Sequence, residues 1–432
     1  MTRVLDKDGA AEASLDLEAT EMAIRSSMHQ VGAVLLEQLL GMDRGYRGPR
    51  VSCGQGHEAD FIDYRSKGVL TVLSRIRVHR AYYHCAACQQ GVIPKDCDLD
   101  IASTSFSPGL RRLMARVGAK EPFDEGRVDL EELAGIVVKT KEVERISEAI
   151  GEQVEDVARR ERKAALAGKV VLLKRVPKMY VAIDGTGVPM VPRETEDRPG
   201  KDETGKAKTR EAKLGCVFTQ TRLDEKGRPL RDDASTSYVG AIETAEEFGR
   251  RIFTEAIRRS SRCAEQIIVL GDGASWIWNI ADEHFPGATQ IVDLYHAREH
   301  LSNLAKVLYG PSTPKAKSWS EARTAELDAG NLEKLIAAMA RLRPAFSAHK
   351  DELRKAIGYF QTNAERMRYE RFRRQGLFVG SGVIEAGCKT IIGRRLKQSG
   401  MRWTVRGANA IIALRCCELS GRWESFWEAR SA

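Results

Sequence analysis

Two stretches, Tyr180-Val-Ala-Ile-Asp-Gly-Thr-Gly187 and Gln266-Ile-Ile-Val-Leu-Gly-Asp-Gly273, decide the fold class of this sequence. In each, a mostly apolar run leads to an aspartate and a glycine. Such runs are typical of buried strands, and Asp-Gly is a frequent turn after a strand. Helical patterns lie around them, so we expect an α/β core in which both strands end on an acid. Ligand and catalytic groups of open α/β sheets gather at such strand ends.

Two further acids extend this pattern. Thr289–Asp293 is a third apolar run that ends on an acid, and Glu385 follows Gly380-Ser-Gly382 at the start of a predicted helix. The region from Arg371 to Arg406 holds nine Lys or Arg residues and this single acid. A lone carboxylate in so basic a stretch is not explained by solubility.

The three acids Asp184, Asp272 and Glu385 are therefore the predicted catalytic residues. Ionised carboxylates repel one another and are tolerated together mainly around divalent cations. Two such cations about 3.5–4 Å apart activate an attacking oxygen and stabilise the leaving oxygen of a phosphodiester. Oxygen ligands favour Mg²⁺ or Mn²⁺, and we expect two ions per site.

The cations around Glu385 match a nucleic-acid backbone drawn across the metal site. Alone, such a run would be read as a solvated basic face, but the embedded acid favours contact with DNA. The predicted DNA-binding residues are Lys389, Arg394, Arg395, Lys397, Arg402, Trp403 and Arg406.

A second, smaller constellation lies upstream. Cys53 and His57 are followed, after 27 residues, by Cys85 and Cys88, and Val69–Leu73 and Ile76–Tyr83 are the strands expected before the second pair. Two close pairs supply the four ligands of a tetrahedral zinc site, which would stabilise a module with little core. We predict a structural Zn²⁺ in a zinc-ribbon-like module, with Cys97 as an alternative ligand.

Helical patterns surround this module. Residues 17–40 form an amphipathic helix, which would serve for packing or for dimerisation. Ser107-Pro108 is a typical helix start. A short helix at Asp129–Gly135 and a second one from Thr140 have the layout of a helix-turn-helix, although a plain helical hairpin has the same pattern.

Long motifs of the C-terminal part resemble, in order, bacterial insertion-sequence transposases of the ISKra group, related to the Mutator-like superfamily. The matching stretches are Asp184-Gly-Thr-Gly-Val-Pro-Met190, Gly271-Asp-Gly-Ala-Ser-Trp-Ile-Trp278, Asp293-Leu-Tyr-His296, Gly382-Val-Ile-Glu385 and Arg394-Arg-Leu-Lys-Gln-Ser-Gly-Met-Arg-Trp403. The resemblance implies a ribonuclease-H-like core with an Asp-Asp-Glu triad and a helical insertion before the glutamate, which Ala305–Arg371 fits.

The resemblance also implies roles for single residues. Asp184 would bridge the two metals, and Asp293 and His296 would orient the active site or the DNA as auxiliary residues. Relatives often carry a further cysteine where this chain has Val51, which leaves the zinc ligand set open.

The expected organisation has six segments. They are an N-terminal helix (1–45), a zinc-ribbon-like module (46–100), a helix-turn-helix segment (101–170), the first part of the ribonuclease-H-like core (171–304), a helical insertion (305–372) and the second part of the core with the catalytic Glu (373–432).

Composition is consistent with these expectations. A net charge of +9 permits a polyanionic partner, and no run of the 432 residues is apolar enough to span a membrane. Met1–Ser14 lacks the apolar region of a secretory signal, and nine scattered cysteines suggest reduced thiols. We expect a cytoplasmic, nucleoid-associated bacterial protein.

Three functions compete at this point. The first is a transposase that binds terminal inverted repeats of double-stranded DNA, cleaves the 3′ ends by hydrolysis and joins them to target DNA. It would act as a homodimer or larger assembly, because two DNA ends need two active sites. The others are a nuclease on the same core and a domesticated or inactive DNA-binding protein that kept the fold.

Overall fold

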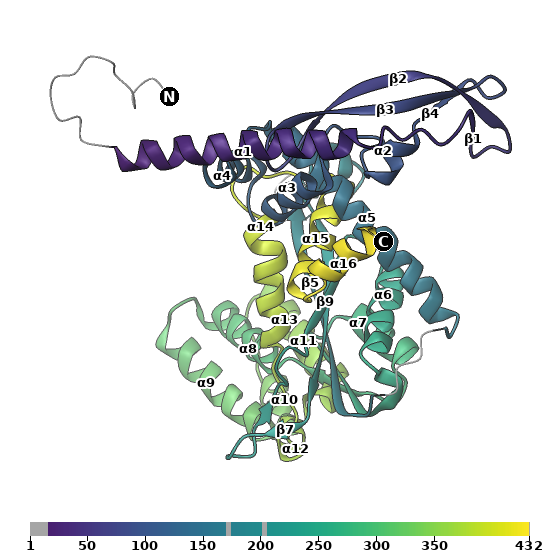
Figure 1. Ribbon diagram of the computed structural model, residues 1–432. Helices are drawn as coiled ribbons and strands as arrows, with labels where there is room; N and C mark the ends of the chain where they lie inside the picture. The colour runs from purple at the N-terminus through teal and green to yellow at the C-terminus, as the bar shows by residue number, and fades with distance from the viewer. Residues whose placement is uncertain (1–15, 170–173, 201–204, 432) are drawn as a thin grey trace. The chain divides into compact units, whose positions relative to one another are not determined.

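The computed structural model describes residues 16–169, 174–200 and 205–431 (Figure 1). The chain divides into two compact units, Met1–Ile150 and Gly151–Ala432, and each is considered by itself. The expected lack of a signal concerns Met1–Ser14, which lies outside the described residues. Among the helices of the described ranges, none is long and apolar enough to span a membrane.

The first unit begins with a long helix, α1 (Leu17–Gly41), as the sequence predicted. Asp16 caps it by accepting a hydrogen bond from the Ala19 amide at 3.0 Å. One face of α1 packs through Ala33 on a small core that includes Val69 and Val78 of the neighbouring sheet. Figure 1 shows α1 lying along this sheet as an extended rod.

That sheet is antiparallel, with strand order β1-β2-β3-β4. Its members are β1 (Arg50–Ser52), β2 (Glu58–Leu70), β3 (Arg75–Cys85) and β4 (Gln90–Val92). The predicted strand Val69–Leu73 was wrong, because β2 begins at Glu58 and ends at Leu70. Most side chains of β2 are solvent-exposed, so the strand lacks the apolar alternation that reveals strands in a sequence.

Helices complete this unit: α2 (Pro94–Asp98), α3 (Pro108–Lys120), α4 (Phe123–Ala134) and the first part of α5 (Thr140–Leu166). The predicted cap is confirmed, since the Ser107 hydroxyl accepts a hydrogen bond from the Leu110 amide at 3.2 Å. Helix α4 begins six residues before the predicted Asp129 and is capped at its C-terminus by Gly135, whose φ is +67°. The Ser147 hydroxyl donates to the Met114 carbonyl at 3.1 Å and joins α5 to α3.

The second unit is mixed α/β, and its sheet has the order β11-β10-β5-β6-β9. Strand β6 is antiparallel to β5 and β9, whereas β10 is parallel to β5 and to β11. The strands are β5 (Val176–Pro189), β6 (Thr209–Gln220), β9 (Ser237–Ala241), β10 (Ala264–Gly271) and β11 (Thr289–Val292); β7 (Arg222–Leu223) and β8 (Pro229–Leu230) form a separate ribbon.

One expectation about this sheet was wrong: β5 does not end on Asp184 but continues to Pro189. Gly185 and Gly187 pair with Lys213 and Glu211 of β6. A Cβ atom at Gly185 would lie 2.6 Å from a carboxylate oxygen of Glu211. The glycine therefore serves close approach of a neighbouring side chain, a role that a strand glycine has as readily as a turn.

Helices flank and follow the sheet. Helix α6 (Ala245–Arg258) packs on α7 (Ser275–His284). A helical segment follows β11: α8 (Leu294–Tyr309), α9 (Pro314–Asp328), α10 (Leu332–Ala340), α11 (Ser347–Thr362) and α12 (Tyr369–Arg374). The chain ends with α13 (Gly382–Gly387), α14 (Arg394–Leu396), α15 (Val405–Leu419) and α16 (Trp423–Ser431). The helical segment before Glu385 thus begins at Leu294, earlier than the predicted 305.

Candidate active site and zinc site

Strand register brings three aspartates to one level of the second unit's sheet. Leu270 of β10 pairs with Ala182 of β5 on one side and with Ile291 of β11 on the other. An aspartate follows each of these three residues two positions later in the chain: Asp184, Asp272 and Asp293. Because these strands are parallel, the three acids form a row, although only Asp272 and Asp293 lie beyond a strand end.

Asp184 lies inside β5 and is mostly shielded from water. Its Oδ1 accepts a hydrogen bond from the Gly185 amide at 2.7 Å. Burial raises the pKa of Asp184, and repulsion from the Asp272 carboxylate raises it further, against a lowering contribution from the Cys388 thiol, which donates a hydrogen bond to it. The ionised form of Asp184 is therefore disfavoured by its surroundings, and a nearby cation would stabilise it.

Asp272 lies in a braced turn after β10. Its Oδ1 accepts from the Ala274 amide at 2.8 Å, and its carbonyl accepts from the Tyr359 hydroxyl of α11 at 2.9 Å. Gly273 has a φ of +104°, and a Cβ atom there would lie 2.6 Å from the Tyr359 ring. Tyr359, from the helical segment before Glu385, therefore holds the backbone of Asp272 in place.

Asp293 is fully buried and joins two segments. Its Oδ1 accepts from the His296 amide at 2.8 Å and caps α8, and its Oδ2 accepts from the Ser381 amide, directly before α13. His296 Nδ1 lies 3.4 Å from Asp293 Oδ1. This contact raises the pKa of His296 to about 9. Asp293 therefore positions the chain that leads to Glu385.

Asp184, His296 and Glu385 line one cavity of about 440 Å³. Asp272 is not among its lining residues; the others are Thr186, Tyr295, Glu299, Cys388, Lys389, Gly393 and Lys397. One ligand atom each of Asp293, His296 and Glu385 lie within 4.8 Å of one another. The structure thus brings Glu385 beside Asp184, which lies 201 positions earlier in the sequence, and beside Asp293 and His296, which lie 92 and 89 positions earlier.

A π-helical turn, Cys388–Gly393, follows α13. The sequence predicted a regular helix here and gave no signal of the wider turn. Such turns are frequent at functional sites. Lys389 lies within this turn and Lys397 follows α14, and Lys397 donates a hydrogen bond to the Thr186 hydroxyl of β5.

Five of the seven predicted DNA-binding residues are solvent-exposed: Lys389, Arg394, Lys397, Arg402 and Arg406. Arg406 already contacts the carboxylate of Glu152.

Arg395 and Trp403 differ from the prediction because both side chains are buried. The Arg395 guanidinium lies 5.0 Å from the Trp403 ring centroid, and Trp403 Nε1 donates to the Leu396 carbonyl at 3.1 Å. Backbone hydrogen bonds from Trp403 to Pro189 and from Val191 to Trp403 hold this segment against the end of β5 and turn the indole inward.

The Trp403→Ala variant tests this correction. Removal of a buried indole should reduce the free energy of unfolding by roughly 3–5 kcal/mol. Arg402→Ala, which removes an exposed side chain at the adjacent position, should change it by less than about 0.5 kcal/mol. Denaturant titration of both variants measures the difference, and equal stabilities would contradict the burial of Trp403.

The predicted zinc ligands come together in the first unit. One ligand atom each of Cys53, His57, Cys85 and Cys88 lie within 4.8 Å of one another, and the Cys53 and Cys88 sulfurs are 3.7 Å apart. The Gln55 amide lowers the pKa of Cys53 to about 7, which favours the thiolate that binds metal. A Cys₃His set is a standard structural zinc set, so these four side chains fit the ion. Cys97 is exposed and lies outside the group.

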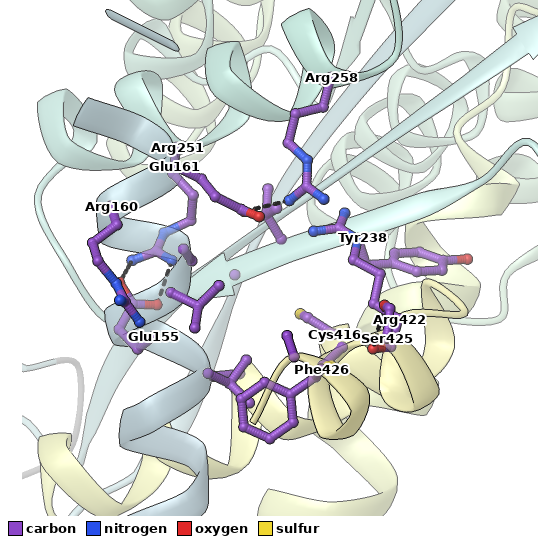
Figure 2. A pocket seen from close by; sticks show the side chains of 18 of the residues that line it. Glu155, Arg160, Glu161, Tyr238, Arg251, Arg258, Cys416, Arg422, Ser425 and Phe426 are labelled. Atoms are coloured by element: carbon purple, nitrogen blue, oxygen red, sulfur yellow. Dashed lines mark hydrogen bonds and ion pairs between the residues drawn. The ribbon is translucent and has the colours of Figure 1, made fainter. Parts of the chain in front are cut away.

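A second cavity, of about 690 Å³, lies between α5, β9, α6, α15 and α16 of the second unit (Figure 2). Its cations are mostly neutralised by glutamates. Arg251 contacts Glu155 and Glu243, each at 2.7 Å. Arg258 pairs with Glu161, and Arg422 pairs with Glu255 at 2.6 Å. No pair of carboxylates free for a metal faces this cavity among the described lining residues, so the acid row remains the candidate active site.

Comparisons with known proteins give the following matches. Residues 240–430 match the Uncharacterised protein family (UPF0236). The Drosophila P element transposase strand transfer complex is similar over 78% of this chain and 84% of that chain, with 10% identity and a TM-score of 0.25. NurA bound to dAMP and manganese is similar over 66% and 64%, with 12% identity and a TM-score of 0.10. A comparison with curated proteins finds no match.

Proposed function

We propose that this chain is a DNA transposase of the Asp-Asp-Glu type, in which Asp184, Asp272 and Glu385 are the catalytic acids. The observation that carries the proposal is the placement of two strand aspartates at one level of the sheet, with Glu385 facing the cavity that Asp184 lines. The motifs shared with ISKra-group transposases contain the same three acids.

The sheet supports the ribonuclease-H-like interpretation. Counted along the chain, three antiparallel strands are followed by two strands that add in parallel to the first, with helices between them. This is the arrangement expected of such a core, and it puts the first and fourth strands side by side. Those are the strands that carry Asp184 and Asp272.

The proposed cofactors are two Mg²⁺ or Mn²⁺ ions, which prefer the carboxylate oxygens that these three acids offer. Asp184, Asp272 and Glu385 would hold them with oxygen ligands, and burial together with repulsion from Asp272 raises the pKa of Asp184. Such ions supply Lewis-acid activation of water or a 3′-hydroxyl and stabilise the leaving oxygen. Both carboxylate oxygens of Asp293 already accept backbone hydrogen bonds, so we assign Asp293 to orienting the site and not to binding a metal. One of its oxygens nevertheless lies within 4.8 Å of a ligand atom of Glu385.

The exposed cations near Glu385 suit the DNA backbone. Lys389 and Lys397 line the catalytic cavity itself, where a phosphate would approach the acids. The zinc module and the helix-turn-helix segment would recognise the terminal repeats.

The decisive experiment is incubation of the full chain with Mg²⁺ and a labelled duplex that carries the element's ends. Cleavage at the 3′ ends, followed by joining to a second duplex, is the expected result. Binding without cleavage would instead support the DNA-binding protein, and cleavage without sequence preference or joining would support the nuclease.

The Asp293→Asn variant tests the positioning role. An amide cannot accept from two backbone amides through both of its terminal atoms, so we expect a loss of about 1–3 kcal/mol in unfolding free energy. Cleavage should fall as Glu385 shifts. The pKa of His296 should fall from about 9 toward its ordinary value, as NMR titration measures, because the Asp293 contact is the largest cause of the elevation. An unchanged His296 pKa would contradict this role.

A further inference from the structure

Helix α1 of the first unit has a second, unpartnered apolar face. Ala33, Leu36 and Leu40 pack on the small sheet. The other face carries exposed apolar residues, each with 52% to 62% of its surface in contact with solvent: Ile24, Met28, Val31 and Leu35. So continuous an exposed apolar face marks an interaction surface.

The spacing on this face is that of a coiled-coil seam. Two sets of residues each repeat every seven positions, offset by four and three. One set is Leu17, Ile24, Val31 and Gln38, and the other is Glu21, Met28, Leu35 and Met42. Knobs-into-holes packing requires this pattern. All eight residues are exposed, and the seam lies opposite the face that contacts the sheet.

We propose that α1 pairs with α1 of a second copy of this chain as an antiparallel two-stranded coiled coil. In one antiparallel register the seam is self-complementary. Leu17 faces Met42 of the other copy, Glu21 faces Gln38, Ile24 faces Leu35 and Met28 faces Val31, and the two-fold axis repeats each layer. Apolar residues meet apolar ones throughout, and each Glu21 carboxylate meets an amide that can donate to it.

The parallel alternative is disfavoured by charge. In a parallel, in-register pair each seam residue meets its own copy, so Glu21 would face Glu21 in a desolvated layer. The antiparallel register removes this repulsion.

A second copy also fits this face better than an anionic membrane does. Helices that lie on membranes are rich in Lys and Arg beside the apolar face. Within Leu17–Gly41 the charged groups are Arg25 and the acids Glu18, Glu21 and Glu37. An isologous contact of a face with itself closes on a dimer. The inference concerns the first unit and does not depend on the proposed function.

The first test is the mass of the full chain without DNA, by light scattering over a concentration series. Twice 48.0 kDa is expected for the dimer. Leu35→Lys puts two cations into the seam and should give the single-chain mass. Gln30→Lys adds the same charge on α1 outside the seam and should remain dimeric. Leu35 is exposed in the single chain, so circular dichroism and thermal unfolding should confirm that the monomeric variant is folded. A wild-type monomer, or a dimer that Leu35→Lys leaves intact, would overturn the proposal.

The second test is orientation. The Ile24→Cys and Leu35→Cys chains are mixed and oxidised, and cross-linked peptides are identified by mass spectrometry. The antiparallel register predicts a 24–35 cross-link in the mixture and none between identical positions in either chain alone. Cross-links between identical positions would contradict the antiparallel register. Gln38→Lys offers a second readout. In the antiparallel dimer each introduced lysine faces a Glu21 carboxylate, so two new ion pairs should raise the affinity of the dimer by about two- to fivefold. In a parallel dimer the two lysines would face each other and lower the affinity.

Discussion

DNA cleavage by the full chain is expected to fall by at least about a hundredfold in each of Asp184→Asn, Asp272→Asn and Glu385→Gln, because metal ligation contributes several kcal/mol to the barrier. Each change keeps the shape of the side chain and removes its negative charge. DNA affinity should be retained, since the exposed cations that would contact the backbone are untouched. Single-turnover cleavage of a labelled duplex in Mg²⁺, with DNA binding measured in parallel, gives both quantities.

A matched carboxylate away from the site serves as the control. Glu225 lies between β7 and β8, is exposed and is not among the residues that line the cavity of Asp184 and Glu385. Glu225→Gln should cleave at the wild-type rate. Undiminished cleavage in any of the three acid variants would remove that residue from the catalytic set. Loss of DNA binding together with cleavage would instead indicate a folding or binding defect.

Zinc removal is expected to have the second large effect. Cys85→Ser, or treatment with a chelator, should reduce bound zinc from about one ion per chain to about none. Cys85 is buried beside Tyr83 and Ala59, so loss of the ion also leaves a polar group inside a small core. Structural zinc contributes directly to folding free energy. We therefore expect the β1–β4 sheet to lose protection in hydrogen exchange while the second unit keeps its protection.

Cys97→Ser is the matched control for zinc, because Cys97 is exposed and lies outside the four-residue group. It should keep the full zinc content. A chain purified with no zinc, in which Cys85→Ser behaves as wild type, would contradict the zinc site. Zinc loss in Cys97→Ser would instead indicate that Cys97 is one of the zinc ligands.

Local signals in the sequence were sufficient for several parts of the structure. The helix after Ser107-Pro108 and the strand before Asp272 were predicted because capping chemistry and a continuous apolar run are encoded in adjacent residues. The four zinc ligands were predicted because Cys85 and Cys88 have the spacing of a zinc-binding pair and Cys53 and His57 offer a second close pair upstream.

Other features depend on contacts between distant segments and left no local signal. The extension of β5 past Asp184 depends on pairing with β6, whose residues close over Gly185. The inward turn of Trp403 depends on backbone hydrogen bonds to the end of β5. Basic residues in one run therefore have different surroundings: Arg402 is exposed, whereas Arg395 is enclosed under the Trp403 ring.

Asp184, Asp272 and Glu385 are proposed to hold divalent ions together. Crystals of the full chain soaked in Mn²⁺ test this proposal most directly, through the anomalous scattering of the ion. We expect anomalous peaks between the three carboxylates, with Asp184 in reach of both ions. Peaks confined to Asp293, His296 and Glu385, or no peak near the strand aspartates, would contradict it.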